Sequence, residues 1–150
     1  MQKYLLLYDS HCPMCCSFLK FLDRHLDSTI VSISVCSSAN IFAHYYPNFS
    51  TLISEKDIIL LDEQLKRTIV LVSLDNGSIK LKSTAILCLF RMSTSFALRV
   101  IGLCLHTPRS IRDIIYDLTA SNRFIISRLM GCSNACSLKF TNLKCYYAID

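Results

Sequence analysis

The chain has 150 residues, of which 52% are hydrophobic and 18% are charged, and its formal net charge is +5. This composition predicts one domain over residues 1–150 with a hydrophobic core, and it excludes an intrinsically disordered chain. The basic residues are scattered over the second half rather than clustered, so we expect no nucleic-acid partner.

The first third of the chain predicts a parallel β-α-β unit. Residues 4–8 are a short apolar run typical of a buried strand, residues 12–26 have helical periodicity, and residues 30–35 are rich in β-branched residues. A strand, a helix and a strand in this order are typical of a parallel unit. The helix has a predicted buried side of Cys15, Phe18, Leu19, Leu22 and Leu26, and a solvent side of Ser17, Lys20, Asp23, Arg24 and Asp27.

The middle of the chain is less uniform. Residues 38–46 predict a short helix ended by Pro47, whereas residues 57–61 fit either a strand or a helix. Residues 68–74 and 78–82 are two β-rich runs around an Asn-Gly pair, which favours the positive φ angles of a tight turn. We therefore predict an antiparallel hairpin.

The remainder predicts helices. Ser83 or Thr84 can cap a helix that continues to about Met92, and further helices are expected at residues 96–105 and 110–126. The last helix has an expected buried side of Ile111, Ile114, Ile115, Leu118 and Ile125. Residues 85–105 are the longest apolar stretch, but two arginines interrupt it, so we expect no membrane span.

Together these elements predict an α/β fold. The strand, helix, strand, hairpin and helix form a thioredoxin-like core over about residues 1–92, followed by additional C-terminal helices over about 93–130. Residues 131–150 show no periodicity and predict an irregular tail.

A pair of cysteines stands at the start of the first helix, in the motif Cys12-Pro13-Met14-Cys15. The unpaired backbone N–H groups and the positive end of the helix dipole stabilise a thiolate at such a position. A C-x-x-C motif beside a β-α-β pattern is typical of a redox site. The motif therefore predicts thiol–disulfide exchange.

The nine cysteines of the chain do not indicate a disulfide framework, because their number is odd and no signal-peptide pattern precedes them. We therefore expect a cytoplasmic protein with mostly reduced cysteines.

Residues 8–15 resemble the Asp-x-x-Cys-x-x-Cys signature of the DCC family of predicted thiol-disulfide oxidoreductases. The resemblance extends over about residues 4–132. Its further matches are residues 82–85, Pro108, residues 111–113, 116–117 and 120–124, and Cys132. Ser10 replaces the glycine that is usual in the family, and Ser121 replaces a common arginine. No proline lies between Asn48 and Thr107, so the cis-proline loop of thioredoxins has no counterpart.

The resemblance implies that Cys12, nearest the helix start and the more exposed of the pair, is the attacking thiolate, and that Cys15 resolves the mixed disulfide. No cofactor is expected besides the redox-active Cys12–Cys15 disulfide. The implied partners are a disulfide-containing protein or small-thiol substrate and a thiol-based electron donor, because the chain has no nucleotide-binding fingerprint. An intracellular location favours substrate reduction, as in a protein-disulfide reductase.

Three neighbours of the dithiol are candidate supporting residues. Pro13 fits the first helical turn and stiffens the loop between the sulfurs. Asp9 either relays a proton to or from Cys15 or forms an Asx turn or cap. His11 either favours the thiolate when it is protonated or is an ordinary loop histidine.

More distant residues are possible accessories. Asn122 and Arg123 either bind a substrate anion or hold the active-site face, or they cap a helix and compensate its dipole. Cys132 and Cys136 are spaced for a second disulfide or thiol pair. Cys16 projects about 100° from Cys15 around the helix, so we expect it to be a buried small hydrophobe.

Two alternatives to the enzyme follow from the same residues. A structural zinc is one, although we expect no metal; its ligands would come from His11, Cys12, Cys15, Cys16, Cys132 and Cys136. The other is a redox-inactive thioredoxin-like module whose basic half binds an acidic partner.

Overall fold

The structure is a computed structural model and describes residues 2–26, 31–46, 48–65, 67–129 and 142–146. Five strands form one mixed sheet in the order β4-β3-β1-β2-β5. Their bounds are β1 Gln2–Leu7, β2 Val31–Cys36, β3 Val70–Ser73, β4 Ile79–Leu81 and β5 Lys144–Tyr146. Strand β1 pairs parallel with β2 and antiparallel with β3, and β3 pairs antiparallel with β4. The predicted β-α-β unit, hairpin and α/β class are confirmed, and the fold is consistent with a thioredoxin-like one.

The central strand β1 explains why the sheet needs a layer on each face. Leu6 packs into one hydrophobic cluster and Leu5 and Leu7 pack into another, and all three are fully buried. A strand buried on both faces has a continuous apolar sequence instead of an alternating one. The run at residues 4–8 is therefore apolar because both faces of the sheet are covered.

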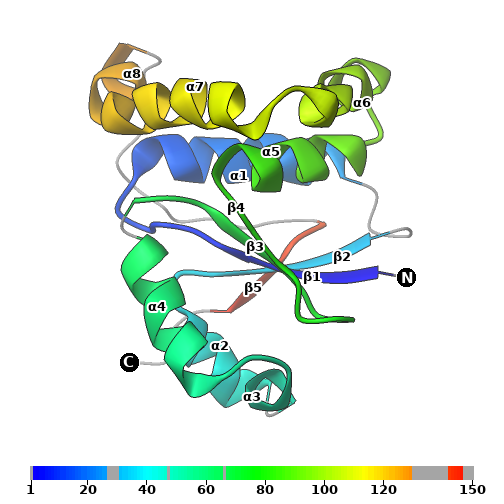
Figure 1. The fold of residues 1–150 in the computed structure, drawn as a ribbon, viewed down its shortest axis with the longest axis vertical. Coiled ribbons are helices and arrows are strands. Elements are labelled where there is room, and N and C mark those ends of the chain that lie inside the picture. Colours follow the sequence, from blue (N-terminus) through cyan, green and yellow to red (C-terminus); the bar gives the residue numbers. More distant parts are fainter. Residues whose placement is uncertain (1, 27–30, 47, 66, 130–141, 147–150) are drawn as a thin grey trace.

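Helices cover the two faces in separate groups (Figure 1). Helices α1 (Pro13–His25) and α5 (Lys82–Arg91) lie on one face. On the other face lie α2 (Ala39–Tyr45), α3 (Phe49–Leu52) and α4 (Glu55–Leu65). The ambiguous residues 57–61 are thus helical. Their buried members, Ile58 and Leu61, are spaced as on one side of a helix.

A third helical layer lies outside α1 and α5 (Figure 1). It consists of α6 (Phe96–Gly102), the 3-10 helix η1 (Leu103–His106), α7 (Arg109–Ser121) and α8 (Arg123–Leu129). Residues 85–105 are divided between α5, α6 and η1. Within the described ranges, every helix is too short or too polar to cross a bilayer.

Two helix boundaries differ from the sequence expectation. Helix α5 begins at Lys82, so its N-cap is Leu81, whose side chain cannot cap it, and Ser83 lies inside the helix, where its hydroxyl donates to the carboxylate of Asp113 on α7. The helix expected at residues 110–126 is divided at Asn122, whose backbone N–H and side-chain amide both donate to the Leu118 carbonyl. Asn122 therefore ends α7, and α8 starts at the next residue.

The predicted buried side of the last helix is wrong. Ile111, Ile114, Ile115, Leu118 and Ile125 are each 57–61% exposed. The inward side of α7 instead carries Tyr116, whose hydroxyl oxygen accepts a hydrogen bond of 3.0 Å from the Ile69 N–H. Periodicity locates an apolar stripe on a helix, but it does not reveal which side the rest of the protein covers.

Asp23 is also placed differently from the prediction. It was expected in solvent, yet it is buried, and one of its carboxylate oxygens accepts from the N–H groups of Asn142 (2.7 Å) and Leu143 (2.9 Å). These contacts lead directly into β5, which pairs parallel with β2. The tail predicted to be irregular thus contains a strand.

Candidate active site

The loop between β1 and α1 places the dithiol at the start of a helix. The Asp9 carboxylate accepts a hydrogen bond of 2.9 Å from the His11 N–H, and the Asp9 carbonyl accepts one of 3.2 Å from the Cys12 N–H. Asp9 therefore forms the Asx turn that was one of its two expected roles. Cys12 is the N-cap residue of α1, Pro13 is the first helical residue, and the His11 side chain is exposed on the loop.

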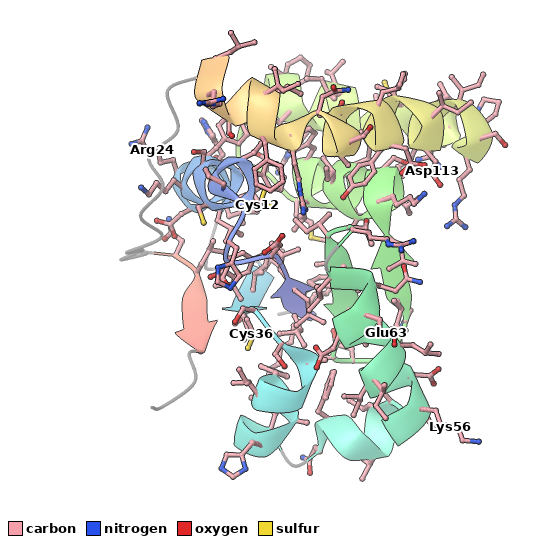
Figure 2. All side chains as sticks on the ribbon, turned by 90° about the vertical axis from the view of Figure 1, so that its left-hand side faces the viewer. Cys12, Arg24, Cys36, Lys56, Glu63 and Asp113 are labelled. Atoms are coloured by element: carbon pink, nitrogen blue, oxygen red, sulfur yellow. The ribbon has the colours of Figure 1, made fainter. Side chains whose placement is uncertain are left out.

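The two active-site sulfurs have different surroundings. The Cys12 sulfur accepts a hydrogen bond from the Cys15 N–H at 3.4 Å, and the side chain is fully buried, whereas Cys15 is partly exposed. The expectation that Cys12 is the more exposed cysteine is wrong. As the N-cap, Cys12 turns its sulfur back over the N–H groups of its own helix, beneath the layer of α7 and α8 (Figure 2).

The ionisation of the two thiols is strongly asymmetric. The pKa of Cys12 is lowered to about 6, chiefly by a hydrogen bond with the Cys15 thiol and further by the Cys15 N–H and the Arg123 charge, while burial and Asp9 oppose this. The pKa of Cys15 is raised, because its proton is held in the hydrogen bond to Cys12 and because the protein shields much of the side chain from water. Near neutral pH the pair consists of a Cys12 thiolate and a Cys15 thiol.

Arg123 connects the third helical layer to the dithiol loop. Its Nη1 lies 3.3 Å from Oδ2 of Asp9, and the two side chains are only 19% and 17% exposed. Asn122, the preceding residue, caps α7. Asn122 thus occupies the capping position that was one of the roles considered for it, whereas Arg123 contacts the dithiol loop through Asp9.

A cavity of about 540 Å³ opens beside Cys15. Its walls come from α1, from the segment that leads into β3, from α5 and from α7, and include Phe18, Ile69, Ile86, Arg112 and Tyr116. Arg112 and Tyr116 were not among the predicted site residues. Tyr116 lies in a segment that resembles the DCC family, but nothing in the sequence distinguishes Arg112 from the other arginines.

The remaining candidate residues are not brought to the dithiol. Cys132 and Cys136 lie outside the described residues. Cys16 is buried, as expected, but it is also disulfide-bonded. Cys36 is a free thiol and lies toward α2 (Figure 2). In the part of the chain that the structure describes, no three His, Cys, Asp or Glu side chains converge as metal ligands.

The chain matches the family model described as DCC1-like thiol-disulfide oxidoreductase over residues 6–129. No curated protein and no solved structure matches it. The matched region includes the dithiol, the whole of α7 and the Asp9–Arg123 ion pair. Because the match spans most of the 150 residues, the chain belongs to the DCC1-like thiol-disulfide oxidoreductase family.

Proposed function

We propose that the protein catalyses the reduction of disulfides, with Cys12 as the nucleophile and Cys15 as the resolving thiol. The observation that carries the proposal is the asymmetric pair, in which the pKa of Cys12 is lowered to about 6 and that of Cys15 is raised. Thiolate is the reactive form in disulfide exchange, so the asymmetry supports a first attack by Cys12.

The reaction proceeds in two exchanges. The Cys12 thiolate attacks one substrate sulfur, forms a mixed disulfide and releases the other sulfur as a thiolate, which takes up a proton. Cys15 then loses its proton and attacks the Cys12 sulfur, which releases the second substrate thiol and leaves a Cys12–Cys15 disulfide. The dithiol has thereby given two electrons to the substrate, and a thiol-based donor restores it by the reverse exchanges.

The first exchange itself prepares Cys15 for the second. While Cys12 is a thiolate, its charge and its hydrogen bond hold the proton on Cys15 and raise the pKa of that thiol. In the mixed disulfide the Cys12 sulfur carries no charge, so both effects are lost and the Cys15 pKa falls. Cys15 is therefore kept protonated until its attack is required.

Access to Cys12 requires a local movement, because its sulfur is buried in the resting structure. The cover includes α8, which packs on α1 and is tied to the dithiol loop by Asp9 and Arg123. We propose that substrate binding displaces the start of α8. We propose a reducing, cytoplasmic setting, which favours the reductive direction.

The first test is a titration of the protein against glutathione redox buffers, with the oxidised form mapped by mass spectrometry and metal content measured on the same sample. We expect a reversible Cys12–Cys15 disulfide that is lost in Cys12→Ser and in Cys15→Ser and retained in the control Cys88→Ala, which removes a free thiol outside the site. One metal ion per chain, with both thiols protected from oxidation, would show that these cysteines bind a structural metal and are not a redox-active pair. Thiols that stay reduced throughout would favour an interaction module.

The roles of the two cysteines are tested by trapping. Cys15→Ser cannot resolve a mixed disulfide, so it should accumulate one mole of substrate on Cys12 when treated with a model disulfide. Cys12→Ser should accumulate substrate much more slowly at neutral pH, because burial still raises the pKa of the remaining Cys15 after the Cys12 thiolate is lost. Accumulation on Cys15 in the Cys12→Ser variant at an equal rate would reverse the assignment.

A further inference from the structure

The cavity beside Cys15 has the character of a small-molecule site. Its volume of about 540 Å³ lies within the range of about 300–1,000 Å³ that is usual for such sites. Most of its wall is apolar, with Phe18 from α1, Ile86 and Phe90 from α5, and Ile101 and Ile115 from the outer layer. The cavity could therefore bury a hydrocarbon chain.

One charged side chain in this wall has unsatisfied donors. Arg112 lies on the inward side of α7, and both its Nε and its Nη1 are buried without a hydrogen-bond partner among the described residues. A buried donor without an acceptor is strongly destabilising, and a buried guanidinium is more so than a neutral group. The natural acceptor for such a group is an anion.

The carboxylates close to this part of the fold already have other partners. Asp113 accepts from Arg109 at 3.2 Å, and Asp117 pairs with Lys82 at 2.8 Å. Asp9 also lines the cavity, but its carboxylate pairs with Arg123. The wall around Arg112 is thus mostly apolar and these three acids are engaged elsewhere, which leaves the two donors of Arg112 to a ligand.

We propose that this cavity binds a single-chain amphiphile with an anionic head group, a carboxylate or a phosphate. The chain lies against the apolar walls, and the head group accepts hydrogen bonds from Nε and Nη1 of Arg112. Because Cys15 also lines the cavity, a bound ligand would lie beside the resolving thiol. The inference does not rest on the proposed redox function, since binding requires neither sulfur.

The test is calorimetric titration of the full, reduced chain with octanoate, octyl phosphate, octanol and octyltrimethylammonium. We expect saturable one-to-one binding of at least one of the two anions. Octanol should bind at least about tenfold more weakly than that anion, because it leaves the Arg112 charge unpaired. The cation should not bind. Comparison of octanoate with octyl phosphate identifies the preferred head group.

Variants test the charge of Arg112 and the space inside the cavity separately. Arg112→Gln should weaken binding of the anion by about tenfold to a hundredfold and leave octanol unchanged. Ala120→Phe should abolish binding of both by filling the space between the walls, since Ala120 lines the cavity. The matched control is Arg24→Gln, because Arg24 is exposed on α1 and points away from the cavity (Figure 2). Circular dichroism verifies that each variant is folded.

Three results would overturn the inference: no saturable binding of either anion, equal affinity for octanol and the anions, or unchanged anion binding in Arg112→Gln. Should Arg112→Gln fail to fold, Arg112→Lys keeps the charge but loses the planar fork and should still bind the anion more weakly than the wild type. The same titration with Cys12→Ser, which cannot reduce disulfides, tests ligand binding independently of the proposed redox function. Binding that persists there supports the ligand site whatever the outcome for disulfide reduction.

Discussion

Arg123, the first residue of α8, lies 3.3 Å from the carboxylate of Asp9, the residue that turns the chain toward Cys12. The two members of this ion pair act on Cys12 in opposite directions, since the charge of Arg123 lowers the pKa of Cys12 and that of Asp9 raises it. The pair therefore joins α8 to the dithiol loop and also adjusts the pKa of Cys12.

Neutralising either partner should move the ionisation of Cys12 in a direction set by the sign of the lost charge. We expect Arg123→Gln to raise the midpoint of Cys12 alkylation with pH and Asp9→Asn to lower it. A charge contact of this kind is worth up to about 1 kcal/mol, or about fivefold in the thiolate population below the midpoint. The measurement is the alkylation rate of the Cys12 peptide by mass spectrometry across pH 4–9. The exposed Arg128→Gln is the control, and shifts of equal sign in both variants would contradict the argument.

The low pKa of Cys12 should depend mainly on Cys15. In the wild type, alkylation of Cys12 should be half-maximal at about pH 6 instead of near the ordinary value of about 8.5. Cys15→Ala should move the midpoint upward, because it removes the thiol whose hydrogen bond is the largest cause of the shift. Cys15→Ser retains a hydroxyl donor and should give an intermediate value. Equal midpoints in the wild type and Cys15→Ala would show that the helix start alone sets the pKa.

The same pKa makes a prediction about stability. The pKa of Cys12 is lower in the folded state than in the unfolded state, so ionisation of this thiol stabilises the folded protein. This stabilisation is complete above the unfolded pKa of about 8.5 and is lost as the pH falls through about 6. The urea midpoint of the reduced wild type, relative to Cys12→Ser, should therefore increase from pH 6 to pH 8.5. The raised pKa of Cys15 acts only above this window. A flat difference would mean that the thiolate is not stabilised in the folded state.

The sequence predicted those parts of the fold that local patterns determine. The apolar run of β1, the β-branched run of β2 and the Asn-Gly turn between β3 and β4 each specify a strand or a turn through properties of neighbouring residues. The position of the dithiol at the start of α1 follows from the same kind of pattern, because Pro13 fits only the first turn of a helix.

Long-range contacts determined the features that were missed. Cys12 is fully buried and lies beneath a helical layer some hundred residues later in the chain (Figure 2), and the buried Asp23 accepts hydrogen bonds from Asn142 and Leu143. Arg112 belongs to the cavity only because α7 turns that side inward. Periodicity and spacing within one segment contain no information about such partners.

The contacts of Asp23 should contribute measurably to stability. Asp23→Ala removes the acceptor of two backbone N–H groups at the start of β5, and each buried donor left without a partner costs about 1–3 kcal/mol. We expect a loss of about 2 kcal/mol in the free energy of unfolding by urea, together with faster amide exchange at Leu143. Asp57→Ala, at an exposed position on α4, should change stability by less than about 0.5 kcal/mol. A loss no larger than that of Asp57→Ala would mean that Asn142 and Leu143 do not donate hydrogen bonds to Asp23 in solution.

A leucine-to-alanine substitution can be compared at a buried position on α5 and at an exposed position on α7. Leu89 is fully buried on α5, whereas Leu118 is 61% exposed on the outer side of α7. Leu89→Ala should lower the free energy of unfolding by about 2–5 kcal/mol, because it removes buried methyl groups and leaves a cavity. Leu118→Ala should change it by less than about 0.5 kcal/mol, because its side chain makes little buried contact to lose. Urea unfolding of both variants measures the contrast, and a loss above about 2 kcal/mol for Leu118→Ala would show that the outer side of α7 is covered in solution.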